Sequence, residues 1–125
     1  MPTVLVVEDD YDFRELERTM LQASGYDVIT ARNGAEALSI LETQRPCVIL
    51  LDLMMPIMDG LTFLQDRKAM THGGDAAPVI CVSAAGKELT AEAVRRGAVH
   101  CLPKPTDLDE LCDTVQPMML VCAYA

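Results

Sequence analysis

The sequence predicts an α/β fold of a single domain, a doubly wound parallel sheet of five strands with helices on both faces. Its length of 125 residues suits one compact core. Short apolar runs alternate five times with segments of helical periodicity, which is the pattern of (βα)5 units. Because crossovers between parallel strands are right-handed, few other topologies remain open.

The five apolar runs are the predicted strands, and they resemble strands that are covered on both faces. The third run, CVILLD, is apolar until its last residue, Asp52, which marks the place where a buried strand reaches the surface. The five runs cover residues 3–7, 26–31, 47–52, 78–84 and 99–102.

The segments that follow these strands are the predicted helices, over 11–25, 33–44, 60–70, 88–97 and 106–116. In the first helix, we expect an apolar stripe to face the core and the charged side chains to lie largely outside it. The stripe consists of Phe13, Leu16, Met20 and Leu21, and the charged residues are Arg14, Glu15, Glu17 and Arg18.

Local signals predict several helix ends. Asp59 and Thr106 have the residue types of N-caps, and Gly97 closes the fourth helix. Residues 71–77, THGGDAA, have the composition of a loop. No segment within the predicted domain has the composition of a linker between domains.

The C-terminal end is divided from the rest by Pro117, which should stop or kink the last helix. We therefore predict a domain over 1–117 and an apolar tail over 118–125. The tail either packs as a kinked continuation of the last helix or forms an exposed apolar patch for a partner or a dimer. It is too short to cross a membrane.

Composition excludes several classes of protein. Half of the residues are hydrophobic, which argues against disorder. The net charge of −9 argues against direct binding of nucleic acid or of anionic lipid. The chain has no apolar run of membrane-spanning length and no signal peptide at residues 1–10, so we expect a cytoplasmic protein without a membrane segment.

The five cysteines are odd in number and form no Cys-x-x-Cys pair. This pattern favours buried free thiols over a disulfide framework or a metal site.

Polar residues collect where the predicted strands end. In an open parallel α/β sheet, ligands bind beyond the carboxyl ends of the strands, so these side chains should lie along one edge. They are Glu8, Asp9 and Asp10 after the first strand, Asp52 at the end of the third, Ser83 on the fourth and Lys104 after the fifth.

This set of residue types suits phosphoryl chemistry at a metal site. Crowded carboxylates repel one another unless a cation lies between them, and hard oxygen ligands suit Mg²⁺. A remaining carboxylate could attack a phosphoryl group, while the metal and Lys104 neutralise the phosphoryl oxygens and Ser83 donates a hydrogen bond. Each residue alone would be an ordinary cap or loop residue, and the joint placement carries the prediction.

Four segments resemble the receiver domain of two-component response regulators, the CheY-like family with a flavodoxin-like fold. The segments are VLVVEDD (4–10), LLDLMMPIMDG (50–60), VICVSA (79–84) and GAVHCLPKP (97–105). The resemblance extends from about residue 3 to residue 115, and the order and spacing of the segments match the family.

The resemblance implies a role for each site residue. Asp52 corresponds to the phosphoacceptor, and Asp9 and Asp52 would bind Mg²⁺ directly, together with the backbone carbonyl of Met54. Glu8 would act on the metal through water. Ser83 takes the position of the switch hydroxyl, and Lys104 that of the phosphate-contacting lysine, followed by a cis peptide bond to Pro105.

The resemblance also implies partners. A histidine kinase or a phosphotransfer protein would supply the phosphoryl group, and a downstream protein would read the result. The receiver would be a monomer or a phosphorylation-dependent dimer, and it would not be an enzyme apart from its own phosphorylation and dephosphorylation. A receiver module cut from a larger regulator or from a hybrid kinase would have the same sequence features.

Two features depart from the family pattern. Cys101 stands where most members have Tyr or Phe, so the usual inward swing of an aromatic ring cannot operate here. The stretch between Ser83 and Gly97 is about one residue shorter than the common pattern. Neighbouring His100 points to the other face of its strand if alternation holds.

Three other functions compete with the receiver. A phosphatase with an Asp nucleophile would need a second Asp where Met54 stands. A flavodoxin-like cofactor binder would need a phosphate-cradling loop in place of the acidic EDDYD. A degenerate receiver would lack part of the set Glu8, Asp9, Asp52, Ser83 and Lys104, all of which are present.

Overall fold

The fold is a five-stranded parallel sheet with helices on both faces, as the sequence predicts. The structure is a computed structural model, and it describes residues 2–70 and 77–123. The strand order is β2-β1-β3-β4-β5, and each strand pairs in parallel with its neighbours. The strands are β1 (Thr3–Val7), β2 (Asp27–Ala31), β3 (Val48–Leu51), β4 (Val79–Ser83) and β5 (His100–Pro103), and the helices are α1 (Tyr11–Ala23), α2 (Gly34–Leu41), α3 (Gly60–Arg67), α4 (Lys87–Arg95) and α5 (Leu108–Ala123).

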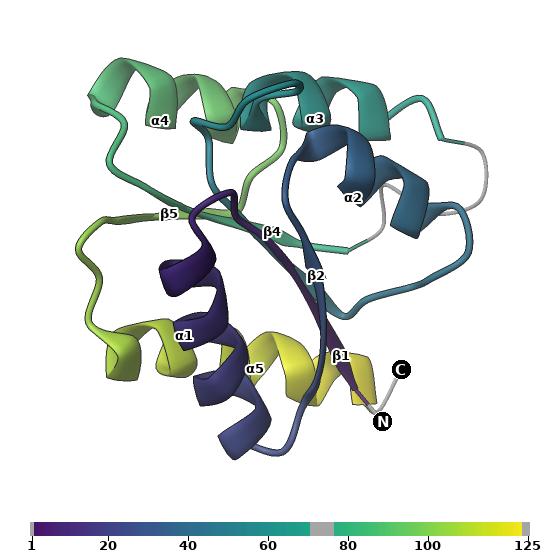
Figure 1. The fold of residues 1–125 in the computed structure, drawn as a ribbon, viewed down its shortest axis with the longest axis vertical. Coiled ribbons are helices and arrows are strands. Elements are labelled where there is room, and N and C mark those ends of the chain that lie inside the picture. The colour runs from purple at the N-terminus through teal and green to yellow at the C-terminus, as the bar shows by residue number, and fades with distance from the viewer. Residues whose placement is uncertain (1, 71–76, 124–125) are drawn as a thin grey trace.

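The sheet divides the core into two layers because alternate strand residues point to opposite faces. In β1, Leu5 and Val7 pack in the layer under α2, α3 and α4, whereas Val4 and Val6 pack in the layer under α1 and α5. Figure 1 shows these two groups of helices on either side of the sheet. All four side chains are buried, so β1 is a central strand covered on both faces.

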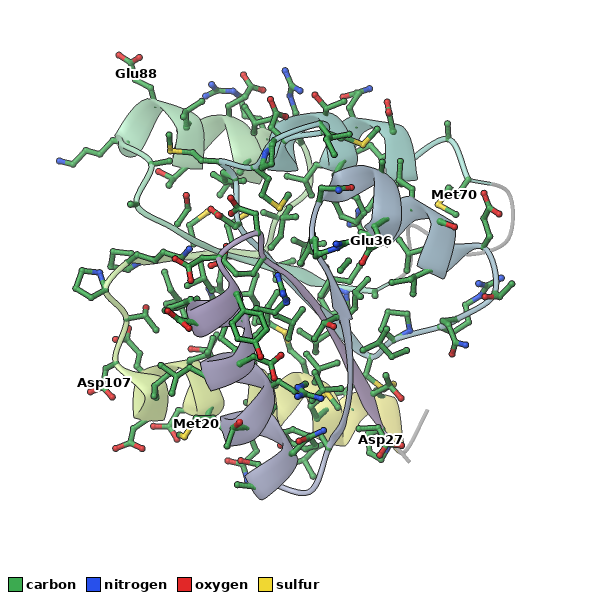
Figure 2. The ribbon with its side chains drawn as sticks, in the orientation of Figure 1. Met20, Asp27, Glu36, Met70, Glu88 and Asp107 are labelled. Atoms are coloured by element: carbon green, nitrogen blue, oxygen red, sulfur yellow. A yellow bond between two sulfur atoms is a disulfide. The ribbon has the colours of Figure 1, made fainter. Side chains whose placement is uncertain are left out.

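Charged side chains lie on the outer surfaces of the helical layers. Glu88 and Asp107 project outward at the edge of the molecule in Figure 2, while apolar side chains fill the space between helices and sheet. In the part of the chain that the structure describes, no helix is long and apolar enough to span a membrane.

The face that α1 turns to the core differs from the predicted stripe. Arg14, Glu17 and Leu21 are buried, whereas Leu16 is 45% exposed. The cause is a specific contact: the Arg14 guanidinium donates a 3.0 Å hydrogen bond to the backbone carbonyl of Glu8 at the end of β1. This bond fixes the rotation of the helix and brings charged residues inward.

Predicted helix ends are partly confirmed. Asp59 is the N-cap of α3, where its carboxylate accepts from the backbone N–H of Thr62 at 2.8 Å. Gly97 follows α4 with a φ of +115°. Thr106 is not a cap, because its hydroxyl donates to Pro103 and the Asp107 carboxylate accepts from the Asp109 N–H instead. Of the predicted loop, residues 71–76 lie outside the described part of the chain.

Helix α5 continues past Pro117 to Ala123, so the apolar segment is a continuation of the helix. Met119 on this continuation is buried against the α1–α5 side of the core, while Leu120 and Val121 are exposed. The alternative of an exposed apolar patch for a partner or a dimer stays a prediction, with Leu120 and Val121 as the exposed side chains.

Two of the five cysteines form a disulfide, which corrects the expectation of free thiols. Cys47, directly before β3, is joined to Cys122 in the last turn of α5, with 5.6 Å between the Cα atoms. Cys81, Cys101 and Cys112 are free. The bridge therefore ties the end of the chain beyond Pro117 to the base of a central strand.

Ile57, in the loop between β3 and α3, has a φ of 69° and a side chain that is 86% exposed. A β-branched residue at positive φ is strained, and exposure means that packing compensates little of the strain. We expect Ile57→Gly to raise the free energy of unfolding by about 1 kcal/mol, after the larger entropy of glycine in the unfolded chain is subtracted. Denaturant unfolding of both proteins measures this, and a less stable glycine variant would contradict it.

Candidate functional site

The carboxyl ends of β1, β3, β4 and β5 meet at one edge of the sheet. Val7 pairs with Leu51, so Glu8 and Asp52 follow their strands side by side, and the Asp52 N–H donates to the Val7 carbonyl at 3.0 Å. Where β4 and β5 end, the Lys104 N–H donates to the Ser83 carbonyl at 3.1 Å. Main-chain pairing alone thus brings together four residues that are distant in the sequence.

Three carboxylates form a cluster at this edge. Each of Glu8, Asp9 and Asp52 offers an oxygen, and these oxygens all lie within 4.8 Å of one another. Glu8 and Asp52 are buried at 2% and 7% exposure, whereas Asp9 is exposed. The cluster is therefore open to solvent on the Asp9 side, and its set of hard oxygen donors fits Mg²⁺.

Lys104 joins the cluster from the loop after β5. Its ammonium makes a close ion pair with Glu8 and lies 3.5 Å from Oδ2 of Asp52. Burial alone would lower the pKa of Lys104, but the hydrogen bond to Glu8 and the charges of the carboxylates raise it above its usual value. The lysine therefore carries a positive charge at the Asp52 carboxylate.

The charge of Glu8 is disfavoured within the folded protein. Burial, followed by the hydrogen bond to Asp52, raises the pKa of Glu8 above its ordinary value, although Lys104 acts in the opposite direction. A bound cation would lower this pKa again, because it favours the ionised form. The cluster is thus electrostatically suited to a cation.

The loop after β3 is folded back onto Asp52. The backbone N–H of Met54 donates to Oδ1 of Asp52 at 3.2 Å, which orients the carboxylate. Gly60 lies so near that a Cβ there would stand 2.6 Å from the Asp52 carbonyl oxygen, so no larger residue fits without a shift of the backbone. The predicted role of the Met54 carbonyl as a metal ligand stays a prediction.

Ser83 ends β4 as a buried residue at the same edge. Its hydroxyl oxygen accepts a hydrogen bond from the Ala85 N–H at 3.1 Å, which leaves the hydroxyl proton available to a ligand. The peptide bond between Lys104 and Pro105 is cis, as the resemblance implies.

Comparison with known proteins decides the family. The profile of the response regulator receiver domain matches residues 4–116. The chain belongs to the response regulator receiver family. It is 34% identical over 114 residues to the sporulation initiation phosphotransferase F of Bacillus subtilis, with 90% of each chain covered.

Solved protein structures share this fold. The N-terminal domain of an uncharacterized protein from Wolinella succinogenes is 30% identical with a TM-score of 0.89, covering 99% of this chain and 98% of that one. The receiver domain of the sensor histidine kinase PA1611 from Pseudomonas aeruginosa PAO1 is 28% identical with a TM-score of 0.85, covering 94% and 97%. That structure contains a magnesium ion coordinated in the active-site cleft.

Other relatives are longer than this receiver. Over 120 residues, the chain is 34% identical to the CpxR homolog of Haemophilus influenzae, a transcriptional regulatory protein, and spans 51% of that protein's length. The match covers 95% of this chain. Receivers thus occur among the relatives both nearly alone and as part of longer proteins.

At the position of the usual switch aromatic, this receiver has a thiol facing a second thiol. Cys101 on β5 pairs in register with Cys81 on β4, and its Sγ donates to the Thr90 carbonyl in α4 at 3.6 Å. Cys101 is half-buried, and His100 beside it is exposed, which agrees with the predicted alternation. A small side chain therefore links β5 to α4 where the family usually has a ring.

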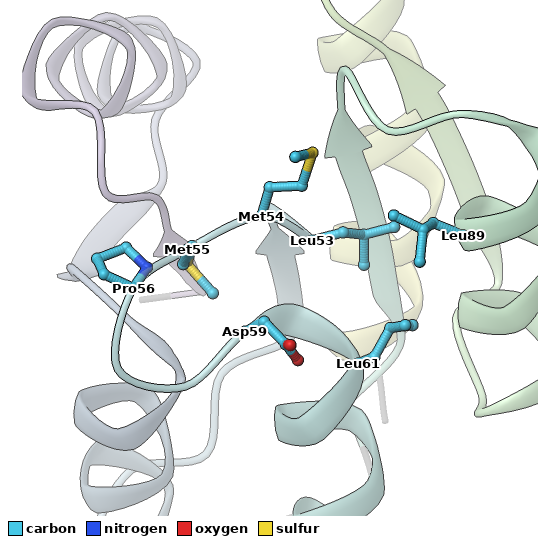
Figure 3. A pocket seen from close by; sticks show the side chains of 7 residues that line it. All are labelled: Leu53, Met54, Met55, Pro56, Asp59, Leu61 and Leu89. Atoms are coloured by element: carbon cyan, nitrogen blue, oxygen red, sulfur yellow. The ribbon is translucent and has the colours of Figure 1, made fainter.

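An apolar pocket of about 400 Å³ opens beside the loop that follows β3. Figure 3 shows Leu89 of α4 facing Leu53 and Leu61 across it. The complete lining consists of Leu53, Met54, Met55, Pro56, Asp59, Leu61 and Leu89. Asp52 thus belongs to the acid cluster, while the residues that directly follow it line an apolar pocket.

Glu17 is a buried acid of the receiver whose position the sequence did not reveal. Burial, together with the negative charge of Glu8, raises its pKa to about 8 from an ordinary value of 4.5, although Lys104 opposes the shift. The folded protein thus holds this proton up to a higher pH than the unfolded chain does. The stabilising contribution of Glu17 is full below pH 4.5 and is lost as the pH rises through about 8.

We expect Glu17→Gln to remove this pH dependence, because the amide stays neutral. At pH 9 the variant should be more stable than the parent by at least about 1.4 kcal/mol, the equivalent of one pKa unit, and the difference should vanish near pH 4. Denaturant unfolding across this range measures it, with exposed Glu110→Gln as the control. Parallel curves for parent and Glu17→Gln would contradict the assignment.

Proposed function

We propose that Asp52 accepts a phosphoryl group from a histidine kinase or a phosphotransfer protein, and that the acyl phosphate switches a surface that a downstream protein reads. The observation that supports this most directly is the contact of one lysine ammonium with two of three clustered carboxylates. Such a site neutralises incoming phosphate charge and keeps a nucleophilic oxygen beside it.

Each residue of the cluster would have a distinct part. An oxygen of Asp52 attacks phosphorus, the bond from phosphorus to the donor breaks, and the donor leaves with its electron pair. Lys104 pairs with the developing charge on the phosphoryl oxygens, and the Ser83 hydroxyl donates to one of them. The Met54 N–H, which contacts Oδ1 of Asp52, holds the carboxylate in place during the attack.

Mg²⁺ would be held by Asp9, Asp52 and the Met54 carbonyl, with Glu8 acting through water. When bound, the ion supplies positive charge for the phosphoryl oxygens and relieves the repulsion among the carboxylates. The raised pKa of Glu8 and the open Asp9 side are the features of this chain that favour such an ion.

The output would be a protein contact rather than turnover of a substrate. A phosphoryl group brings about −1.5 to −2 charges to the edge of the sheet, enough to bias the loop after Ser83 and helix α4. We place this receiver in the cytoplasm, as a monomer or a phosphorylation-dependent dimer, whether it acts alone or as a module of a larger protein.

Exposure of the protein to a small phosphodonor such as acetyl phosphate, with and without Mg²⁺, tests the proposal. Intact mass should show the gain of one phosphoryl group with Mg²⁺ and little gain after chelation. An unmodified protein would refute the proposal. Steady turnover of a phosphate ester would instead indicate a phosphatase.

A further inference from the structure

The ammonium of Lys104 also contacts an aromatic ring. Its Nζ lies 4.5 Å from the centroid of the Phe13 ring, well within the range of a cation–π interaction. The ammonium is therefore bordered by the carboxylates of Glu8 and Asp52 and by the face of Phe13, and the lysine side chain is only 20% exposed.

The ring of Phe13 is held in place by α1. The Phe13 N–H donates to the N-cap carboxylate of Asp10 at 3.0 Å, and the half-buried ring packs against the core between α1, α5 and the sheet. In the next residue, the Arg14 guanidinium donates to the Glu8 carbonyl. The first turn of α1 is thus tied to the end of β1, and the ring is fixed relative to the acid cluster.

We propose that Phe13 is a positioning residue for phosphoryl transfer, whose ring holds the ammonium of Lys104 at the edge of the acid cluster. The inference rests on the proposed function, since it concerns the readiness of Lys104 to meet a phosphoryl group.

The chemical reason lies in the properties of the two side chains. Lysine carries a compact charge on a flexible stem and loses considerable rotamer freedom when it is held in one place. If carboxylates were its only partners, the ammonium would compete with Mg²⁺ for the same acids. The ring attracts the ammonium through its quadrupole and bears no charge that would repel phosphate.

Comparison of Phe13→Leu with Phe13→Tyr separates the ring from the packing. Leucine keeps an apolar side chain in the core but has no aromatic face, whereas tyrosine keeps the face. With acetyl phosphate and Mg²⁺, we expect the maximal phosphorylation rate of Phe13→Leu to fall about three- to tenfold and that of Phe13→Tyr to stay near the parent rate. Leu16→Ala, an exposed change one turn further along α1, should leave the rate unchanged.

A second measurement needs no phosphodonor. Competitive acetylation by acetic anhydride reports how freely the Lys104 amine reacts, with exposed Lys87 as internal reference. Phe13→Leu should make Lys104 about three- to tenfold more reactive, because the ring no longer attracts the ammonium and no longer covers it. Phe13→Tyr should leave the reactivity as in the parent.

Three results would overturn the inference: an unchanged phosphorylation rate in Phe13→Leu, an equal loss in Phe13→Tyr, or unchanged reactivity of Lys104 in Phe13→Leu. Failure of the proposed function looks different, because the parent itself would then take no phosphoryl group. In that case the acetylation experiment still decides whether the ring holds Lys104.

Discussion

Asp52→Asn should abolish the uptake of a phosphoryl group from a small phosphodonor with Mg²⁺. The amide is a poor nucleophile and cannot replace the carboxylate in the transfer, although it keeps the shape of the side chain. We expect the variant to stay folded, because the substitution removes one of three crowded charges and Lys104 keeps its ion pair with Glu8. Intact mass after incubation measures the effect.

The matched control is Asp66→Asn, which removes an exposed carboxylate on α3 and should be phosphorylated at the parent rate. A folded Asp52→Asn protein that gains a phosphoryl group as fast as the parent would show that another residue is the acceptor. Circular dichroism of each variant establishes that folding is retained.

The second large effect concerns the disulfide between Cys47 and Cys122. The two residues are 75 apart in the sequence, so the bridge closes a long loop and restricts the unfolded chain strongly. We expect Cys122→Ser to lower the free energy of unfolding by about 3–4 kcal/mol under oxidising conditions. Its last helical turn, beyond Pro117, should lose protection from hydrogen exchange first, because that proline already removes a helical hydrogen bond.

Reductant provides the internal control for this prediction. Reductant breaks the bridge, as reducing conditions do in general. It should therefore destabilise the parent to the level of Cys122→Ser and leave that variant unchanged. Cys112→Ser, a change of a free and half-buried thiol on α5, should keep the full response to reductant. A parent whose stability does not change with reductant would show that the bridge does not form.

The sheet and the site edge were predictable because both follow from local patterns. Unbroken apolar runs identified central strands such as β1 and β3, and parallel topology then required Glu8, Asp52 and Lys104 to meet. Asp59 was likewise predictable as an N-cap from its place before α3.

The failures concern contacts that depend on tertiary placement. The bridge between Cys47 and Cys122 was missed, because an odd count without close spacing does not reveal which residues the fold brings together. The sequence predicts Arg14 and Glu17 outside the buried face of α1, because periodicity cannot detect a hydrogen bond to the Glu8 carbonyl. One signal was available: around the helix axis, Leu16 is rotated away from the side that Phe13 and Leu21 share.

The central claim is that the phosphoryl group resides on Asp52, and its position on the chain tests this most directly. Borohydride reduces an aspartyl phosphate to homoserine, so reduction of the phosphorylated protein followed by peptide mass analysis marks the acceptor. We predict homoserine at position 52 alone, in an amount that depends on Mg²⁺. A mark at position 9 or 10, or none in protein that has gained a phosphoryl group, would contradict the account.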